Sequence, residues 1–313
     1  MQILVLEEIS SIGINLLKQK NFTVLMKLGI DRSSQLLAVG DADAIIIKSI
    51  TQVNKNFLDA AKNLKIIGRA GAGLDNIDIQ ECQKRNIKIV STPTLNSDSA
   101  ADFTLMQILC LSRNAYIAQE MVKNNNFSRD LLLGRQLNKL KVGIVGYGNV
   151  GRKVAKRLNS FGVEILFYDP NLKDDVFENY SQRIYALNDL LGAVDVLTIH
   201  SPLNSSTKDL INDNEFNIMK KGIIFINTSR GQVVNEDALV RAIENKIISF
   251  AALDVCVNEP PYDQNHTDYN YSNKLLNYTN IYYTPHIGAS TVDAQDSISE
   301  YICGVIIEHL TKL

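Results

Sequence analysis

The segment Lys141–Arg152, KVGIVGYGNVGR, decides the fold because it predicts a strand, a glycine-rich turn and a helix in that order. Val142–Val145 is apolar and β-branched, and Asn149–Asn159 has the apolar spacing of a helix. The glycines between them follow the pattern G-x-G-x-x-G at Gly146, Gly148 and Gly151. The first permits a tight turn, the second lets a pyrophosphate approach the backbone, and the third lets helix and strand pack closely. The segment therefore predicts a dinucleotide-binding βαβ unit.

The next predicted strand indicates which dinucleotide is bound. Glu164–Tyr168 leads into Asp169, about 20 residues beyond the glycines, where a carboxylate accepts hydrogen bonds from the adenine ribose. A carboxylate at this position repels a 2′-phosphate, and no arginine follows Asp169 directly. We therefore expect NAD rather than NADP.

Composition excludes several classes of protein. A chain of 313 residues suits two domains, and a net charge of −2 without a basic run argues against a nucleic-acid partner. No apolar run approaches the ~20 residues of a membrane helix, and the N-terminus predicts a strand rather than a signal peptide. We therefore expect a soluble, cytoplasmic protein. We also expect no metal ligands, because the four cysteines are scattered and form no CxxC pair; they are Cys82, Cys110, Cys256 and Cys303.

Strands and helices alternate in two blocks. The expected strands of the first block are Ile3–Leu6, Thr23–Met26, Ala44–Lys48, Lys65–Gly68 and Ile87–Val90. Those of the second are Val142–Val145, Glu164–Tyr168, Val194–Ile199, Ile223–Asn227, Phe250–Leu253 and Ile281–Thr284. This alternation predicts an α/β fold with two parallel sheets, each covered by helices on both faces.

Two long helical patterns set the domain organisation. Residues 97–113 form a helix between the blocks, and residues 290–310 form another, begun by Ser290, that no strand follows. We expect the last helix to return to the first block. The expected domains are thus residues 1–96 plus 287–313, which bind substrate, and residues 97–286, which bind NAD and carry a helical arm at 97–126. Residues 263–273 are polar and predict a loop.

Candidate chemistry gathers at the predicted carboxyl edge of the second sheet, where open α/β folds bind ligands. Of the four histidines, His266 falls in the polar loop and His309 near the C-terminus, whereas His200 and His286 each follow a strand. Arg230 and Glu259 follow two further strands. An acid, a carboxylate that orients it and a fixed cation are what reversible hydride transfer to a 2-oxo acid requires.

The first block has a glycine turn of its own, Gly68–Gly73, GRAGAG. The strand after it ends without an acid for a ribose, so a second nucleotide site is disfavoured. We expect the backbone at Ala70 and Gly71, with the Arg69 side chain, to form an anion nest for a substrate carboxylate. A simple tight turn is the alternative.

Six segments together resemble the D-2-hydroxyacid dehydrogenase family: GRAGAGLDNID, VGIVGYGNVGR, TIHSPL, NTSRGQVVNEDAL, AALDVCVNEPP and TPHIGAST. The resemblance implies two doubly wound parallel-sheet domains, with a Rossmann NAD-binding domain inserted into a flavodoxin-like substrate domain. It further implies that His286 is the general acid/base, that Glu259 is its partner, and that Arg230 binds the substrate carboxylate and carbonyl.

The same resemblance implies the NAD contacts. The pyrophosphate would lie on the glycine turn and the first residues of the following helix, and the nicotinamide at the ends of the later strands. The implied residues are Asn149 and Val150 with Gly146, Gly148 and Gly151 for the pyrophosphate, Asp169 for the ribose, Ser201 for the adenosine side, Thr228, Ser229 and Arg230 for the nicotinamide side, Asp254 for its carboxamide, and Ala72, His286, Gly288 and Ala289 closing over it.

The substrate is implied by the branch of the family that the chain resembles most. We expect oxidation of 3-phospho-D-glycerate to 3-phosphooxypyruvate, the first step of L-serine biosynthesis. Its cations would be Lys48, Arg69 and Arg129, with Asn96 also touching substrate. That branch often has Arg where Lys48 stands, and Lys cannot grip a phosphate bidentately. Three scattered surface charges are the alternative.

Other functions remain open at this point. A reductase of glyoxylate or hydroxypyruvate would use the same residues, and a non-catalytic NAD-sensing protein would keep them. A formate dehydrogenase is disfavoured, because its relatives carry Gln where this chain has Glu259. The family further implies a homodimer formed through the helical arm. Long members carry a serine-binding regulatory domain, and because the chain ends at Leu313 we expect neither that domain nor serine inhibition.

Overall fold

The computed structural model describes residues 1–173, 178–259 and 271–312. These residues form two compact units: residues 1–96 with 290–312 (unit 1), and residues 97–259 with 271–289 (unit 2). The sequence predicted that the second domain ends at residue 286, whereas unit 2 extends to residue 289. The reason is that the backbone N–H groups of Ile287 and Gly288 bond to Asp254, which belongs to unit 2.

Unit 1 is built on a five-stranded sheet with the order β2-β1-β3-β4-β5, and the described strands pair in parallel. This order is that of flavodoxin-like folds. Its strands are β1 (Gln2–Val5), β2 (Thr23–Met26), β3 (Ala44–Ile47), β4 (Ile66–Arg69) and β5 (Lys88–Val90), and its helices before the last are α1 (Ser11–Gln19), α2 (Arg32–Ala38), η1 (Val39–Asp41), α3 (Lys55–Ala60) and α4 (Ile79–Lys84).

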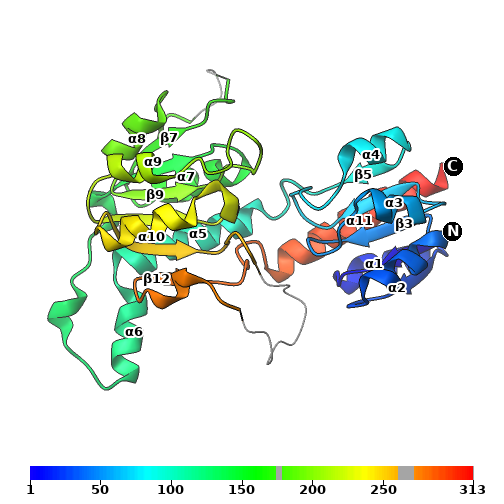
Figure 1. The fold of residues 1–313 in the computed structure, drawn as a ribbon, viewed down its shortest axis with the longest axis horizontal. Helices are drawn as coiled ribbons and strands as arrows, with labels where there is room; N and C mark the ends of the chain where they lie inside the picture. The colour runs from blue at the N-terminus through cyan, green and yellow to red at the C-terminus, as the bar shows by residue number, and fades with distance from the viewer. Residues whose placement is uncertain (174–177, 260–270, 313) are drawn as a thin grey trace. The chain divides into compact units, whose positions relative to one another are not determined.

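The C-terminal helix α11 (Val292–Thr311) packs against α1 in unit 1, so both ends of the chain lie in this unit (Figure 1). Ser299 Oγ donates to Ser10 O at 2.8 Å, and a Cβ on Gly13 would stand 2.3 Å from Ser299 Oγ. The glycine therefore permits the close approach of the two helices. The N-cap is Thr291, whose side chain accepts from Ala294 N, so the helix begins later than the expected start at Ser290.

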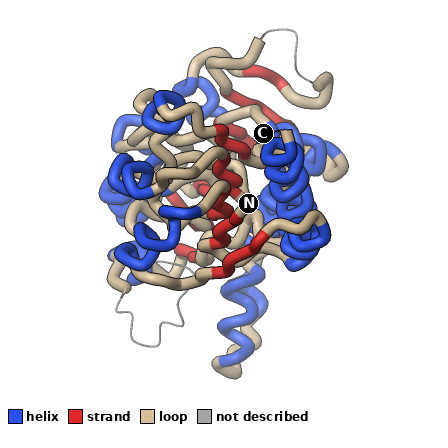
Figure 2. Tube along the Cα trace, turned by 90° about the vertical axis from the view of Figure 1, so that its right-hand side faces the viewer, coloured by secondary structure: helices blue, strands red, loops and turns tan. Residues whose placement is uncertain are grey.

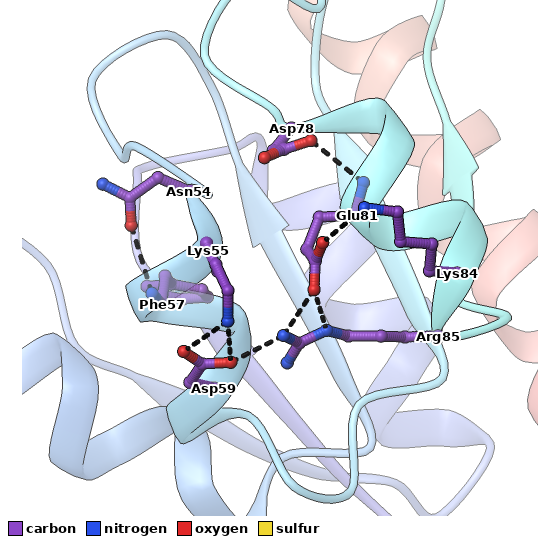
Figure 3. Close-up of polar contacts among 8 residues, drawn as sticks. All are labelled: Asn54, Lys55, Phe57, Asp59, Asp78, Glu81, Lys84 and Arg85. Carbon is purple, nitrogen blue, oxygen red and sulfur yellow. Dashed lines mark hydrogen bonds and ion pairs between the residues drawn. The ribbon is translucent and has the colours of Figure 1, made fainter.

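An ion-pair network joins α3 and α4 at the surface of unit 1 (Figure 3). One guanidinium nitrogen of Arg85, Nη2, lies 2.6 Å from Glu81 Oε1 and 2.6 Å from Asp59 Oδ1. Asn54 and Asp78 cap the two helices by accepting backbone N–H bonds. Since these groups pair with one another on an exposed face, the network is structural.

Unit 2 is built on a seven-stranded sheet with the order β12-β11-β10-β9-β6-β7-β8, again parallel in each pairing that the described strands make. The central order is that of the Rossmann fold. Its strands are β6 (Lys141–Val145), β7 (Glu164–Tyr168), β8 (Gln182–Arg183), β9 (Val196–Ile199), β10 (Ile223–Asn227), β11 (Ile248–Leu253) and β12 (Ile281–Tyr283).

Helices cover both faces of this sheet, and one buried cluster lies under each face. The helices are α5 (Ser97–Ser112), α6 (Ala115–Lys123), α7 (Asn149–Asn159), α8 (Leu187–Ala193), α9 (Asp213–Ile218) and α10 (Glu236–Glu244), with short 3₁₀ turns η2 (Arg129–Leu132), η3 (Leu137–Lys139), η4 (Gly231–Val233) and η5 (Lys274–Asn277).

The expected helical arm at 97–126 is two helices rather than one. Asn114, with φ of 54°, ends the first and begins the second. Helix α5 buries Ile108 and Leu111 in the core of its own unit, whereas α6 has no buried residue and extends away from the sheet (Figures 1 and 2). The segment between Ser112 and Arg135, which includes α6 and is called the excursion below, closes at its base, where Arg135 N donates to Ser112 O at 2.8 Å.

The predicted fold class is confirmed: each unit is an α/β parallel sheet, and the Rossmann unit interrupts the flavodoxin-like one. Each expected strand is present with ends shifted by at most two residues, and β8 was not expected because it is only two residues long. Among the described residues, no helix combines the length and the apolar character needed to cross a membrane. Residues 263–270 of the expected loop, with His266, lie outside the described residues.

Candidate active site

The glycine turn between β6 and α7 has the shape that a dinucleotide requires. Gly146 has φ of +90°, and a Cβ there would stand 2.8 Å from Ser201 N. A Cβ on Gly151 would stand 2.2 Å from Gly146 O, so this glycine allows the helix to pack on the turn. A Cβ on Gly148, in contrast, would meet nothing within 4 Å. The turn therefore leaves open space at Gly148, where a side chain would fill the position that a pyrophosphate takes.

The N-terminus of α7 suits an anion. Asn149 and Val150 are its first residues, Gly148 is its N-cap, and its first turn carries no acidic residue. The helix dipole and the N–H groups of the first turn favour phosphate oxygens at such a terminus. Together with the open space at Gly148, these residues fit the diphosphate of NAD.

Asp169 follows β7 and is held against the glycine turn. Its Oδ2 accepts from Tyr147 N at 2.9 Å, and its Oδ1 accepts from Asn171 N at 2.9 Å. The structure adds a neighbour that the sequence did not indicate, because Arg183 Nη2 donates to Asp169 O at 2.9 Å. Arg183 is 14 residues from Asp169 in the chain and belongs to the short strand β8, so the residues directly after Asp169 do not reveal this contact.

A buried tyrosine supports the turn from below. The ring of Tyr147 stacks on Phe167 with centroids 3.8 Å apart, and its hydroxyl lies 2.8 Å from Glu178 Oε2 and 2.7 Å from Ser181 Oγ. Burial raises the pKa of the Tyr147 hydroxyl, so this hydroxyl stays protonated and can donate a hydrogen bond. Tyr147 thus anchors the position between Gly146 and Gly148.

Arg230 stands just beyond β10, on a turn organised by Asn227. Asn227 Oδ1 accepts from Ser229 N at 3.0 Å and from Ser229 Oγ at 2.8 Å, while Asn227 Nδ2 donates to Arg230 O at 3.0 Å. Thr228 Oγ1 lies 3.0 Å from Thr104 Oγ1 of α5. The sequence indicated Thr228, Ser229 and Arg230 but not Asn227, whose role depends on its side chain turning back along the chain.

The imidazole and the carboxylate of the expected catalytic pair are in contact. His286 Nδ1 lies 2.9 Å from Glu259 Oε2, and Glu259 Oε1 accepts from Cys256 N at 3.0 Å. The side chains of His286 and Glu259 are 31% and 23% exposed, so the pair is reachable by a ligand. Because β10, β11 and β12 are adjacent, the segments bearing Arg230, Glu259 and His286 follow neighbouring strands. An imidazole, the carboxylate that contacts it and a guanidinium thus share one sheet edge.

Asp254 braces the turn that carries His286. Its carboxylate is buried and accepts from Thr284 Oγ1 at 2.6 Å, from Ile287 N at 2.9 Å and from Gly288 N at 2.7 Å. Burial raises its pKa, although these hydrogen bonds oppose the shift. His286 has φ of 54°, which is rare for a residue with a side chain, so the turn needs such bracing. The resemblance implied only a carboxamide contact for Asp254.

His200 has a different environment from His286. Its Nε2 lies 3.0 Å from Thr198 Oγ1, and its backbone packs against Gly146. Although part of the residue reaches the surface, burial of the imidazole lowers the pKa of His200 to about 3. A histidine that stays neutral in this way has a structural role below the glycine turn, and the adjoining Ser201 is also buried.

Unit 1 contains the remaining cationic candidates, Lys48 and Arg69. Burial and the charge of Arg69 lower the pKa of Lys48, while Glu7 and Glu8 oppose this shift. Ala70 N donates to Ile47 O at 2.8 Å and Gly71 N donates to Arg69 O at 2.9 Å. The two amides of the expected anion nest thus donate to carbonyl groups within unit 1, and the nest stays a prediction.

The predicted site residues divide between the two units. Unit 1 holds Lys48, Arg69, Ala70, Gly71, Ala72 and Asn96. Unit 2 holds the residues of the glycine turn and of the strand ends, from Gly146 to Ala289, which gather at one edge of its sheet. Arg129 also belongs to unit 2, but it is exposed at the start of η2 on the excursion that includes α6.

Known proteins are similar to this chain in sequence and in fold. Human D-3-phosphoglycerate dehydrogenase is 35% identical over 287 residues, which cover 92% of this chain and 52% of that protein. D-lactate dehydrogenase from Aquifex aeolicus, solved with NAD and lactic acid, is 27% identical with a TM-score of 0.87, covering 100% of this chain and 96% of that one. A glyoxylate reductase from Paecilomyes thermophila is 27% identical with a TM-score of 0.86, covering 98% and 94%. The chain spans about half the length of the curated relatives it matches.

The family's own sequence profile covers most of unit 2. The profile described as "D-isomer specific 2-hydroxyacid dehydrogenase, NAD binding domain" matches residues 105–288. This range includes the glycine turn, Asp169 and the Arg230, Glu259 and His286 strand ends. The chain belongs to the D-isomer specific 2-hydroxyacid dehydrogenase family and carries its NAD-binding domain.

Proposed function

We propose that the protein is an NAD-dependent dehydrogenase that oxidises 3-phospho-D-glycerate at C2 to 3-phosphooxypyruvate, the first step of L-serine biosynthesis. The observation that carries the proposal is the 2.9 Å contact between His286 Nδ1 and Glu259 Oε2, at the sheet edge that also bears Arg230. It supports an enzyme because a base with an orienting carboxylate is the apparatus for moving a hydroxyl proton.

Each of these residues has a defined part. Bound NAD supplies the acceptor for the hydride that leaves C2. Neutral His286 takes the C2 hydroxyl proton at Nε2, since Nδ1 faces Glu259. Glu259 stabilises the imidazolium that forms, and Arg230 holds the carboxylate and the developing carbonyl of the substrate. The products are the 2-oxo acid, NADH and one proton, which His286 later releases.

The choice of a phosphorylated substrate is supported by charge and by the relatives. Lys48 and Arg69 lie near enough in unit 1 for the charge of one to affect the other. Two cations suit a substrate with a phosphate besides its carboxylate. Human D-3-phosphoglycerate dehydrogenase, at 35% identity, supports the same substrate.

A comparison of substrates tests this choice. NADH formation from 3-phospho-D-glycerate should exceed that from D-glycerate in kcat/KM by at least about 100-fold, a margin typical of a lost charged contact. NADH consumption with hydroxypyruvate and glyoxylate measures the main alternative, a reductase, which the likeness to a glyoxylate reductase favours. Faster turnover of either unphosphorylated acid would overturn the substrate proposal.

A substitution tests the mechanism separately. The variant His286→Asn should lose at least about 100-fold in kcat, because the loss of a general base of this kind costs about 10²–10⁴-fold. Its affinity for NADH should stay within a few fold, while His309→Asn on α11 serves as the matched control. Unchanged turnover in His286→Asn would refute the role of this histidine. NADH binding without turnover of any hydroxy acid would instead indicate an NAD-sensing protein.

We also propose a homodimer formed through α6. This helix buries no residue in its own unit, and the excursion around it exposes Val122 (49%), Phe127 (70%) and Leu133 (84%). A groove of about 600 Å³ lies beside it, lined by Tyr116, Met121 and Tyr282 among others. Sedimentation should give a dimer that Phe127→Glu dissociates and that Leu37→Glu, an exposed leucine in unit 1, does not. A monomeric wild-type protein would exclude this interface.

A further inference from the structure

Two successive backbone N–H groups hold the turn that carries Glu259, and each donates to a carboxylate. Cys256 N donates to Glu259 Oε1 at 3.0 Å. Val257 N donates to Glu236 Oε1 at 2.7 Å. The first bond orients Glu259 within its own turn, and the second ties that turn to the start of α10.

Glu236 belongs to the same connection as Arg230. This connection follows β10 through η4 to α10, and Glu236 is the first residue of α10. A Cβ on Gly231 would stand 2.0 Å from Cys256 C, so the connection packs directly on the backbone of the Glu259 turn. Gln232 Nε2 also reaches Val257 O at 3.5 Å. The Arg230 and Glu259 segments are therefore joined by backbone packing and by the Glu236 side chain.

We propose that Glu236 is a positioning residue for the reaction, which places the Glu259 carboxylate against His286 and sets it relative to Arg230. This rests on the proposed roles of His286, Glu259 and Arg230. Without the Glu236 bond, the Val257 amide loses its partner and the turn is free to tilt. Glu259 then keeps its charge but loses its alignment with Nδ1 of His286, on which proton transfer depends.

Asp237 provides a matched control. It also lies in the first turn of α10, so its removal costs the same favourable interaction with the helix dipole. Its carboxylate pairs with Lys274 at the surface and is 63% exposed. A change that acts only through the charge or stability of α10 should therefore appear equally in Asp237→Ala and Glu236→Ala.

The experiment measures kcat, KM, NADH affinity and Tm for Glu236→Ala, Glu236→Gln, Glu236→Asp and Asp237→Ala. Glu236→Ala should lower kcat about 10-fold with NADH affinity unchanged. Glu236→Gln should stay within about 2-fold of wild type, because its carboxamide oxygen still accepts from Val257 N. Glu236→Asp, which keeps the charge but is one methylene shorter, should resemble Glu236→Ala and decides the matter if the alanine variant does not fold. Asp237→Ala should leave kcat unchanged.

A double variant identifies the path of the effect. If Glu236 acts through Glu259, adding Glu236→Ala to Glu259→Gln should lower kcat by less than 2-fold beyond Glu259→Gln alone. The proposal would be overturned if the kcat losses of Glu236→Ala and Glu259→Gln multiplied in the double variant, or if Asp237→Ala lost as much kcat as Glu236→Ala. An unchanged kcat in both Glu236→Ala and Glu236→Asp would also overturn it. His286→Asn is measured alongside: if it retains full turnover, the proposed function has failed, and if it is inactive while the Glu236 variants behave as wild type, only this inference has failed.

Discussion

Replacing Gly148 by alanine separates cofactor binding from folding. Gly148 has φ of −83° and ψ of −150°, which an alanine can adopt, and the added Cβ meets nothing within 4 Å. The folded protein should therefore be no less stable, and the loss of glycine freedom in the unfolded chain should raise the free energy of unfolding by up to about 1 kcal/mol. The same Cβ would occupy the open space proposed for the pyrophosphate, so the affinity for NADH should fall at least ~10-fold, about 1.4 kcal/mol.

Gly151→Ala is the matched comparison within the same turn. Its Cβ would stand 2.2 Å from Gly146 O, an overlap that should cost about 1–3 kcal/mol of stability. Thermal denaturation without cofactor should therefore rank Gly148→Ala at or above wild type and Gly151→Ala below both. NADH fluorescence titration at a temperature where all three are folded completes the test. Wild-type affinity in Gly148→Ala would refute the placement of the pyrophosphate at this turn.

Three further predictions concern packing, bracing and pH. In urea denaturation, Gly13→Ala should lower the free energy of unfolding by about 1–3 kcal/mol, because its Cβ would stand 2.3 Å from Ser299 Oγ. Gly304→Ala, which has open space around it on α11, should raise the free energy of unfolding by up to about 1 kcal/mol. Equal effects of the two variants would contradict the packing of α1 on α11. Asp254→Asn turns one acceptor of the carboxylate into a donor facing N–H groups, so kcat/KM should fall at least ~10-fold, and a steady-state assay showing no loss would contradict the bracing of the His286 turn. Burial lowers the pKa of His200 to about 3, against about 6.5 in the unfolded chain, so the stability that the neutral imidazole contributes is complete above about pH 6.5 and is lost as the pH falls toward 3. In urea titrations, His200→Asn should therefore reduce the loss of stability between pH 7 and pH 5 by about 1–2 kcal/mol. Parallel curves of stability against pH for the variant and the wild type would exclude this.

Local patterns in the sequence were sufficient to predict the two sheets, the glycine turn and the residues at the strand ends. The apolar runs and the helical spacing predicted both parallel sheets, since each strand or helix is formed by residues near one another in the chain. The three glycines predicted the dinucleotide turn because Gly146 and Gly151 meet steric limits within the turn, whereas Gly148 leaves space for a ligand. Strand ends likewise placed Arg230, Glu259 and His286 at one edge, because parallel strands share a carboxyl edge.

Other features depend on contacts between distant segments. Asp254 reaches Gly288, Glu236 reaches Val257, and Arg183 reaches Asp169, and no local pattern marks which partner each side chain will meet. The hydrogen bond from the Ala70 amide to Ile47 O of the neighbouring strand β3 is another such contact.

The sequence by itself determined the fold class, the glycine turn and the residue types at the strand ends, because backbone periodicity and steric demand act over a few residues. Only the tertiary structure decided that α5 is buried while α6 extends outward, where the second unit ends, and which hydrogen bonds hold His286 and Glu259 in place. These outcomes depend on how the sheet brings remote segments together, and hydrogen bonds that are short in space can join residues far apart in the chain.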